Sequence, residues 1–391
     1  MFGNKSDRHM IRMDQLCIGL HVRLDRWLGH PFLFSSFKIK DEAQIAALRA
    51  MGLEEIEYLP QRSDTRPAEP AARTIPPPAA TAPNAAFDAL MQQKRERIET
   101  LSKERARIQA AEKKYVKTAN SVKNVGRIAN SNPSQAAAQA GEIADDLVEA
   151  FLAEEAPFIH LMGDHVADES AYYHSLNVTV LALIMARAVG IGDAQTVHDI
   201  VRGAVLHDVG KALIPSQVLL KTEDLNSAEL KLLNLHPGYG IKLMQGVEGL
   251  PRRVLEIILY HHEMVDGSGY PKGLAGDAID PAVRIVAIAN AYDNLCNPRQ
   301  VERSRTPSEA LSHLFKNESA KFDRATLAAF IKALGIYPPG TIVKLKSGRI
   351  GIVMSVDSAD LLHPDLMIYD QTIPKEDAAV LNLRRDLDDE V

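Results

Sequence analysis

Cysteine and tryptophan are scarce in this sequence of 391 residues, which contains two cysteines and one tryptophan. Cys17 and Cys296 are too few for a disulfide framework or for a metal site made of thiolates, and they fit a reducing compartment. The 13 histidines are therefore the more informative residues.

Long apolar runs and an excess of positive charge are also missing. No apolar run reaches the roughly 20 residues that a membrane span needs, and the N-terminus MFGNKSDRHM is too polar for a secretory signal. We therefore expect a cytoplasmic protein without a membrane span. A net charge of -6 argues against a partner that is a nucleic-acid polymer, whereas a small phosphate ligand needs only a local cationic site.

The first third of the chain predicts a small domain followed by a linker and a long helix. Residues 8–64 have the alternating and helical apolar spacing of a small α/β domain, and residues 65–84 form a Pro/Ala-rich linker. Residues 85–132 predict a charged connecting helix. One heptad seam of this helix is apolar, at Leu101, Ile108, Tyr115 and Val122, but the companion seam contains Ile98, Arg105, Glu112 and Ala119. The pattern leaves open a homodimer seam and a solvated helix that packs one stripe on a neighbour.

The remainder predicts an all-α domain and a short β extension. From 133 to 336 nearly every segment has helical periodicity, and Thr306, Pro307 and Glu309 spell a capping box with proline at the first helical position. Residues 337–391 change to β-alternation with a turn at Ser347 and Gly348, followed by an acidic tail. The fold class is therefore mainly α, with a small N-terminal α/β domain and a C-terminal β extension.

Histidines within the helical segment recur in a way that is hard to attribute to surface positions. A lone histidine on a helix is more often a satisfied residue than a metal ligand, but His207 with Asp208 and His261 with His262 each end an apolar helix. Two adjacent buried imidazoles need partners for four ring nitrogens, and a metal supplies such a partner. Imidazole and carboxylate together suit iron, manganese or zinc. A carboxylate such as Asp208 can bridge two metals, an arrangement used for attack on a phosphoryl group.

Three motifs resemble the successive signatures of the HD-GYP family: GAVLHDVGKALIP, LHPGYGIKLM and HHEMVDGSGYPKGLAG. The segment GLHVRLDRWLGHPFLFSSFKIK is similar to the domain of unknown function that often precedes HD-GYP domains in bacteria. The resemblance implies a helical HD-superfamily bundle at 133–336 and a site with two or three divalent transition metals, iron or manganese, of which we expect two. It also implies hydrolysis of cyclic di-GMP to linear pGpG or GMP.

The resemblance assigns roles to individual residues. The metal ligands would be His174, His207, Asp208, His236, His261, His262 and, at an aspartate position of the family, Asn290. Asp208 and Lys211 would be catalytic, with the Lys211 ammonium facing the scissile phosphate. Gly269, Tyr270 and Pro271 would shape the loop beside the ligand, and Arg299 would contact its phosphate. Taken alone, DGSGYP is also an ordinary turn.

Three positions depart from the family pattern. Asn290 replaces a carboxylate ligand and so removes one negative charge, whereas the second aspartate of that signature is present as Asp293 and would have a separate structural role. Ser170 stands where members with a third metal have a glutamate, and NPRQVERS alters the segment around Arg299.

These departures leave three functions open. The first is an active hydrolase of cyclic di-GMP. The second is a module that binds cyclic di-GMP, or a GGDEF-domain diguanylate cyclase, without turnover. The third is a hydrolase of another phosphate ester, which the GYP signature disfavours.

Overall fold

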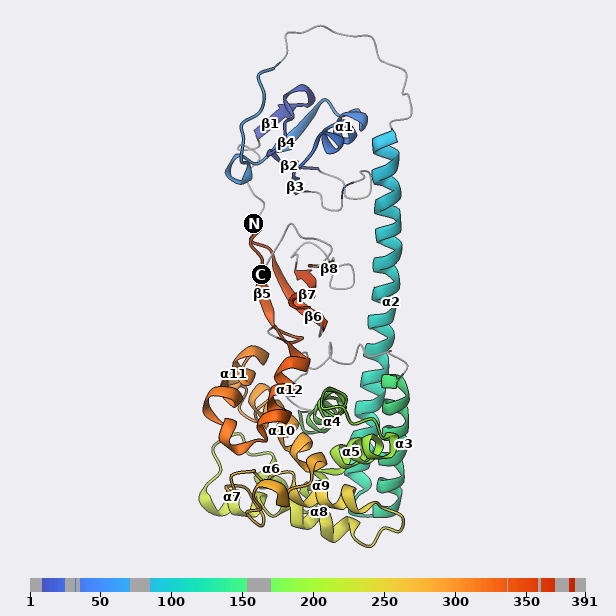
Figure 1. Cartoon of the computed structure of the whole chain (residues 1–391), viewed down its shortest axis with the longest axis vertical. Helices are drawn as coiled ribbons and strands as arrows, with labels where there is room; N and C mark the ends of the chain where they lie inside the picture. The colour runs from blue at the N-terminus through green and yellow to red at the C-terminus, as the bar shows by residue number, and fades with distance from the viewer. Residues whose placement is uncertain are drawn as a thin grey trace. The chain divides into compact units, whose positions relative to one another are not determined.

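The computed structural model describes residues 9–24, 32, 36–70, 85–152, 170–335, 337–357, 360–369 and 380–383. The chain divides into two compact units, Met1–Glu104 and Arg105–Val391, whose elements are drawn in Figure 1. Helix α2, Ala85–Ile128, contributes residues to both units. Residues 71–84 of the predicted linker and the acidic tail lie outside the described residues.

The first unit contains a small α/β fold, as the sequence predicted. Its antiparallel sheet has the strand order β1-β4-β2-β3, with β1 at His9–Arg12, β2 at His21–Arg23, β3 at Ser36–Lys38 and β4 at Glu55–Tyr58. The other elements are α1 at Glu42–Ala50 and the 3-10 turns η2 at Met13–Gln15 and η4 at Pro60–Arg62. The unit has its own buried core, which includes Leu20, Val22, Ile45, Leu48 and Ile56.

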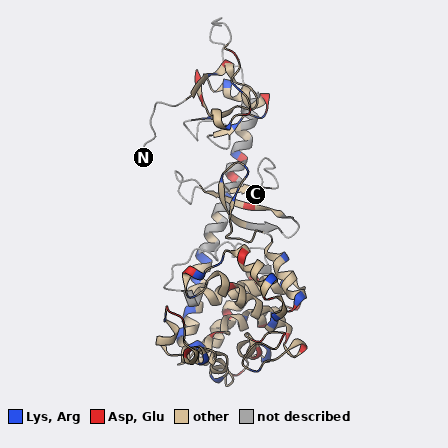
Figure 2. Ribbon diagram, turned by 90° about the vertical axis from the view of Figure 1, so that its left-hand side faces the viewer, with Lys and Arg blue, Asp and Glu red and all other residues tan. Residues whose placement is uncertain are grey.

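The second unit is mainly helical. After α2 its elements are α3 Pro133–Leu152, α4 Ser170–Ala188, α5 Ala194–Leu206, η7 Val209–Leu213, α6 Ser216–Leu219, α7 Ser227–Leu233, α8 His236–Met244, α9 Arg252–Tyr260, η8 Gly276–Ala278, α10 Pro281–Cys296, η9 Val301–Arg303, α11 Pro307–Asn317, η10 Ser319–Lys321 and α12 Arg324–Leu334. Helix α11 begins with the predicted capping box: the Thr306 hydroxyl accepts from the Glu309 N–H, and the Glu309 carboxylate accepts from the Thr306 N–H. In Figure 2, basic and acidic residues are interspersed along these helices.

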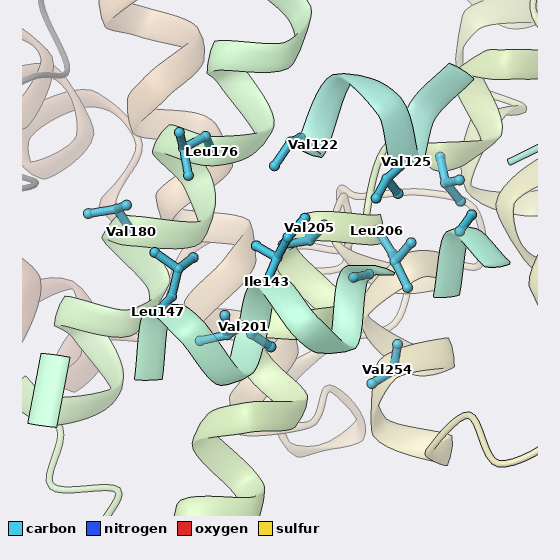
Figure 3. Packing of buried hydrophobic residues seen from close by; sticks show 14 of the residues in the cluster. Val122, Val125, Ile143, Leu147, Leu176, Val180, Val201, Val205, Leu206 and Val254 are labelled. Carbon is cyan, nitrogen blue, oxygen red and sulfur yellow. The ribbon is translucent and has the colours of Figure 1, made fainter. Parts of the chain in front are cut away.

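The C-terminal part of α2 packs into the core of the helical unit. Tyr115, Ala119, Val122 and Val125 are buried, and they share one apolar cluster with residues of α3, α4, α5 and α9. Figure 3 shows this packing of Val122 and Val125 beside side chains from those helices. From Tyr115 onward, α2 therefore stabilises the helical unit, and this part of the apolar stripe packs within the same chain. The side chains of Leu101 and Ile108 lie outside the description.

The C-terminal extension is an antiparallel sheet of order β5-β6-β7-β8. Its strands are β5 Ile342–Lys344, β6 Ile350–Asp357, β7 Asp360–Tyr369 and β8 Val380–Asn382. Gly348, at the predicted turn between β5 and β6, has a φ of 83°, a conformation that favours glycine. The mainly α fold class with its two small β-containing parts is thus confirmed. Within the described ranges, no helix is both long and apolar enough to cross a membrane.

Candidate metal centre

Six of the predicted metal ligands, all except Asn290, come from four helices and meet largely at helix ends. His174 lies in α4, His207 is the C-cap residue of α5 and is followed by Asp208, and His236 is the first residue of α8. His261 is the C-cap residue of α9 and is followed by His262. We call these five histidines and Asp208 the histidine cluster. Its ligand atoms form two groups, each within 4.8 Å: His174, His207 and Asp208, and His236, His261 and His262.

Glycine at position 210 brings two of these segments together. Gly210 lies in η7, two residues after Asp208, and a Cβ at this position would collide with the carbonyl oxygen of His236 and with the backbone nitrogen of Gly240. Because the obstacles are backbone atoms of α8, a side chain could not be accommodated without moving the helix. The close approach therefore holds Asp208 beside His236.

Asp208 lies at the centre of the cluster. Its Oδ1 is 3.2 Å from the Nε2 of His236 and 3.9 Å from that of His261. Its Oδ2 is 3.3 Å from the Nε2 of His207 and 3.6 Å from that of His174. Each carboxylate oxygen thus faces a different pair of imidazoles, which is the arrangement expected of a bridging ligand between two cations.

The hydrogen bonds of the ring nitrogens fix which atoms are available as ligands. The Nδ1 of His207 lies 2.7 Å from the Ala204 carbonyl, and that of His236 lies 2.8 Å from the Leu233 carbonyl. The Nδ1 of His261 is 3.0 Å from the Ile258 carbonyl. A carbonyl can only accept, so each Nδ1 carries the proton and each Nε2 has a free lone pair. Such bonds from the second ring nitrogen are typical of metal-ligating histidines.

Lone pairs that face one another give a direct test of whether a cation fits. The Nε2 atoms of His236 and His261 lie 3.1 Å apart, although neither carries a proton in the tautomers just assigned. The Nε2 of His207 is buried and has no hydrogen-bond partner among the described residues. Facing lone pairs and an unsatisfied buried nitrogen are unfavourable unless a cation lies among them. These donors therefore fit transition-metal ions.

The electrostatics favour the ligand form of four of these groups, three histidines and Asp208, at neutral pH. Burial lowers the pKa of His236 to about 4, and burial with neighbouring imidazoles lowers the pKa of His261 and His262 well below its ordinary value. Burial alone would raise the pKa of Asp208, but Lys211 and His207 hold it well below the usual range. These three imidazoles are thus neutral and the carboxylate is charged, as metal binding requires.

Lys211 and the GYP loop border the cluster. The Lys211 Nζ is 2.5 Å from the Asp208 Oδ2, and a third of its side chain is exposed. The Tyr270 ring stacks on the His262 ring with centroids 4.5 Å apart. A Cβ on Gly269 would collide with the backbone of residues 262–264, so glycine lets the loop pass close to His262. The Tyr270 N–H donates to the His262 carbonyl at 3.1 Å, and Pro271 follows in this loop.

Asn290 and Arg299 have described contacts that do not involve the histidine cluster. Asn290 is buried in α10, and its Oδ1 accepts a hydrogen bond of 2.9 Å from Asn294. The Arg299 Nη2 donates to the backbone carbonyls of Val218, Leu219 and Lys221, which ties its segment to the end of α6. Their roles as metal ligand and phosphate contact remain predictions.

Sequence reasoning gave Asp293 a structural role but missed its contact with His174 and the other residues that support the cluster from behind. The Oδ2 of Asp293 lies 2.6 Å from the Nδ1 of His174, and the Oδ1 of Asp293 accepts a hydrogen bond of 2.8 Å from the Nδ2 of Asn177. Buried Glu263 accepts hydrogen bonds from the N–H groups of Lys272 and Leu274, and so closes the GYP loop. Asn177 follows His174 by three residues on one helix, a spacing that could have indicated a shared face.

Comparison with known proteins agrees with this site. Residues 146–326 match the family model described as HD domain, and residues 9–140 match the domain of unknown function DUF3391. A cyclic di-GMP phosphodiesterase of Pseudomonas aeruginosa is 28% identical over 365 residues, which cover 92% of this chain and 84% of the relative.

Two further relatives match a smaller part of the chain. A cyclic di-GMP phosphodiesterase response regulator of Xanthomonas campestris is 37% identical over 39% of this chain and 40% of its own. A 3'3'-cGAMP-specific phosphodiesterase of Vibrio cholerae is 31% identical over 42% of this chain and 35% of its own. The chain spans less than half of the length of each of these two relatives. The resemblance to HD-GYP proteins is confirmed: the chain carries an HD domain at residues 146–326 behind a DUF3391 domain at residues 9–140.

Proposed function

We propose that the helical domain is a metal-dependent phosphodiesterase that hydrolyses cyclic di-GMP to pGpG or GMP. The observation that carries this proposal is the orientation of the histidine cluster. Its Nε2 lone pairs converge on one carboxylate, and three of the rings are fixed by backbone carbonyls. A buried group of nitrogen and oxygen lone pairs with no proton between them is unfavourable unless it binds cations.

The donor set supports two divalent transition metals, and we propose iron or manganese. One metal would be held by His174, His207 and Asp208, and the other by Asp208 with His236, His261 and His262. When bound, such metals supply an acidic water at neutral pH and positive charge for the phosphate oxygens. Asn290 would add an amide oxygen, which carries no formal charge.

The chain's own residues would orient the phosphodiester. Lys211 places an ammonium beside Asp208 with part of its stem exposed, so it can reach the scissile phosphate of a ligand above the cluster. Tyr270, packed on His262, presents its ring at the edge of the same site, where we expect Gly269 and Pro271 to shape the ligand loop. Arg299 would contact a second phosphate only if it exchanged its carbonyl partners.

The names of the relatives support a cyclic dinucleotide as the substrate. The relative that aligns with nearly the whole chain is a cyclic di-GMP phosphodiesterase, and this favours cyclic di-GMP. Another relative is a 3'3'-cGAMP-specific phosphodiesterase, so the two nucleotides need a direct comparison.

A second function, binding of cyclic di-GMP or of a GGDEF-domain diguanylate cyclase without turnover, is favoured by one observation. The amide oxygen of Asn290, at the position of an expected aspartate ligand, accepts a hydrogen bond from Asn294. A metal there would have to compete with that bond, and it would gain no negative charge. The homodimer and the cytoplasmic location remain predictions from the sequence.

Anaerobic incubation of the purified protein with manganese or iron and cyclic di-GMP, followed by chromatographic product analysis, tests the function. We expect linear pGpG or GMP, and slower conversion of 3'3'-cGAMP. A tightly bound nucleotide that is recovered unchanged would support the binding module instead. Faster conversion of 3'3'-cGAMP would correct the substrate.

A further inference from the structure

A chain of buried hydrogen bonds leads from α2 to the histidine cluster. The Tyr115 hydroxyl donates to the Oδ1 of Asn177 at 2.5 Å, and the Nδ2 of Asn177 donates to the Oδ1 of Asp293 at 2.8 Å. The Oδ2 of Asp293 accepts from the Nδ1 of His174 at 2.6 Å. All four residues are buried, with exposed fractions from 1% to 8%, so water competes little for these bonds.

Each bond in this chain fixes the orientation of the next side chain. An amide can present either its oxygen or its NH₂ group to a neighbour, and the Tyr115 hydroxyl selects the rotamer of Asn177 that points the NH₂ group at Asp293. Asn297 donates to the same carboxylate oxygen at 2.8 Å, which leaves the other oxygen for the ring of His174. The proton on the Nδ1 of His174 then leaves its Nε2 lone pair facing the site.

Burial, followed by the charge of Asp293, raises the pKa of the Tyr115 hydroxyl, so this group keeps its proton and remains a donor. The Tyr115 ring also stacks on Tyr173, which directly precedes His174, with centroids 6.0 Å apart. Both the ring and the hydroxyl of Tyr115 therefore contact the same stretch of α4.

We propose that Tyr115 is a positioning residue for the metal ligand His174 and acts through the two buried side chains between them. The inference rests on the proposed metal site and deepens it. Tyr115 lies outside the HD domain match at 146–326 and inside the DUF3391 match at 9–140. The segment that matches the preceding domain family thus supplies a supporting residue to the metal site. A displacement of α2 at Tyr115 would change the orientation of the His174 ring.

The variant Tyr115→Phe removes the hydroxyl and keeps the ring. Because residues behind a metal ligand typically contribute 10–100-fold to metal affinity, and Tyr115 is two residues removed from His174, we expect about tenfold weaker binding of one of two Mn²⁺ ions. The second ion should bind as before. Competition titration with a chelating dye measures both affinities without any substrate.

Tyr292→Phe is the matched control. Tyr292 is also buried and is the neighbour of Asp293 in α10, but its hydroxyl pairs with Cys296. We expect this variant to bind both ions with wild-type affinity. A double-mutant cycle sharpens the test, since Tyr115→Phe should have no further effect in an Asn177→Ala background if the hydroxyl acts through Asn177.

A second readout requires no metal. In the metal-free protein, the imidazole Nδ1–H signal of His174 in NMR spectra should shift in Tyr115→Phe and stay unchanged in Tyr292→Phe. Two ions bound with wild-type affinity by Tyr115→Phe, with an unchanged His174 signal, would overturn the positioning role and leave the proposed function intact. Equal losses in both variants would also overturn it. A wild-type protein that binds no metal would instead overturn the proposed function, and the inference with it.

Discussion

The histidine cluster and the layer of residues behind it differ in how they are distributed along the chain. The cluster is built from short local motifs, of which His207 with Asp208 and His261 with His262 are adjacent pairs at helix ends. The layer behind it joins Asn177 to Asp293, 116 residues away, and to Tyr115, 62 residues away. Groups that contact a cation must come in a recognisable set, whereas groups that orient them need only a hydrogen bond at the right place.

The largest effect is expected at the centre of the histidine cluster, where two adjacent residues contribute most of the contacts. Replacing His207 and Asp208 with alanine removes a ligand and the carboxylate that faces four imidazoles, so we expect loss of both metals and of any hydrolysis. Elemental analysis and product chromatography measure the two losses. His313→Ala, a histidine of α11 outside the cluster, is the control. Retained turnover in the double variant would place the chemistry elsewhere.

Gly210→Ala tests the close approach that holds the two halves of the cluster together. The new Cβ would meet backbone atoms of α8, so we expect the free energy of unfolding to fall by about 1–3 kcal/mol and metal binding to weaken.

Gly238→Ala, in the helix α8 that Gly210 packs against, is the matched control, because a Cβ at position 238 meets nothing within 4 Å. It should leave stability unchanged or raise it by up to about 1 kcal/mol, since alanine is the better helix former. Urea unfolding measures both variants. Equal stability of the two variants would mean that η7 and α8 are not held as closely as described.

Asn290→Asp tests whether a missing charge limits the site. The substitution adds a carboxylate at nearly constant volume, and Asn294 can still donate to it. We expect hydrolysis at limiting metal to rise about tenfold, which corresponds to about 1.4 kcal/mol, and the difference to shrink at saturating metal. Initial rates across a metal titration provide the check. Unchanged affinity and rate would place residue 290 outside the metal site, whereas a gain in metal without hydrolysis would direct attention to the segment around Arg299.

The smallest effect is expected in the supporting layer, at Glu263. Glu263→Gln keeps an acceptor for one of the N–H groups of Lys272 and Leu274 but removes the charge, so stability should fall by about 1 kcal/mol. Metal affinity should change little, because Glu263 closes the loop and none of its described contacts is with a ligand nitrogen. A loss of metal as large as that of the double variant would show that loop and cluster are not separable.

Local sequence signals predicted much of the fold and the inner site. The capping box at Thr306, the turn at Gly348 and the helix ends at His207 and His261 each depend on neighbouring residues, and each is present in the structure. The apolar stripe of α2 was visible too, but its partner was not, because periodicity gives the buried face of a helix and not the surface that covers it. The partner of Asn177 could not be predicted for the same reason, because no residue near Asn177 in the sequence indicates that Asp293 accepts its hydrogen bond.

Metal analysis of the wild-type protein, purified without chelators and reconstituted anaerobically with manganese or iron, tests the central claim most directly. The convergence of the imidazoles on Asp208 predicts two tightly bound equivalents per chain. Fewer than about half an equivalent, unchanged by reconstitution, would contradict the presence of a metal centre at these helix ends.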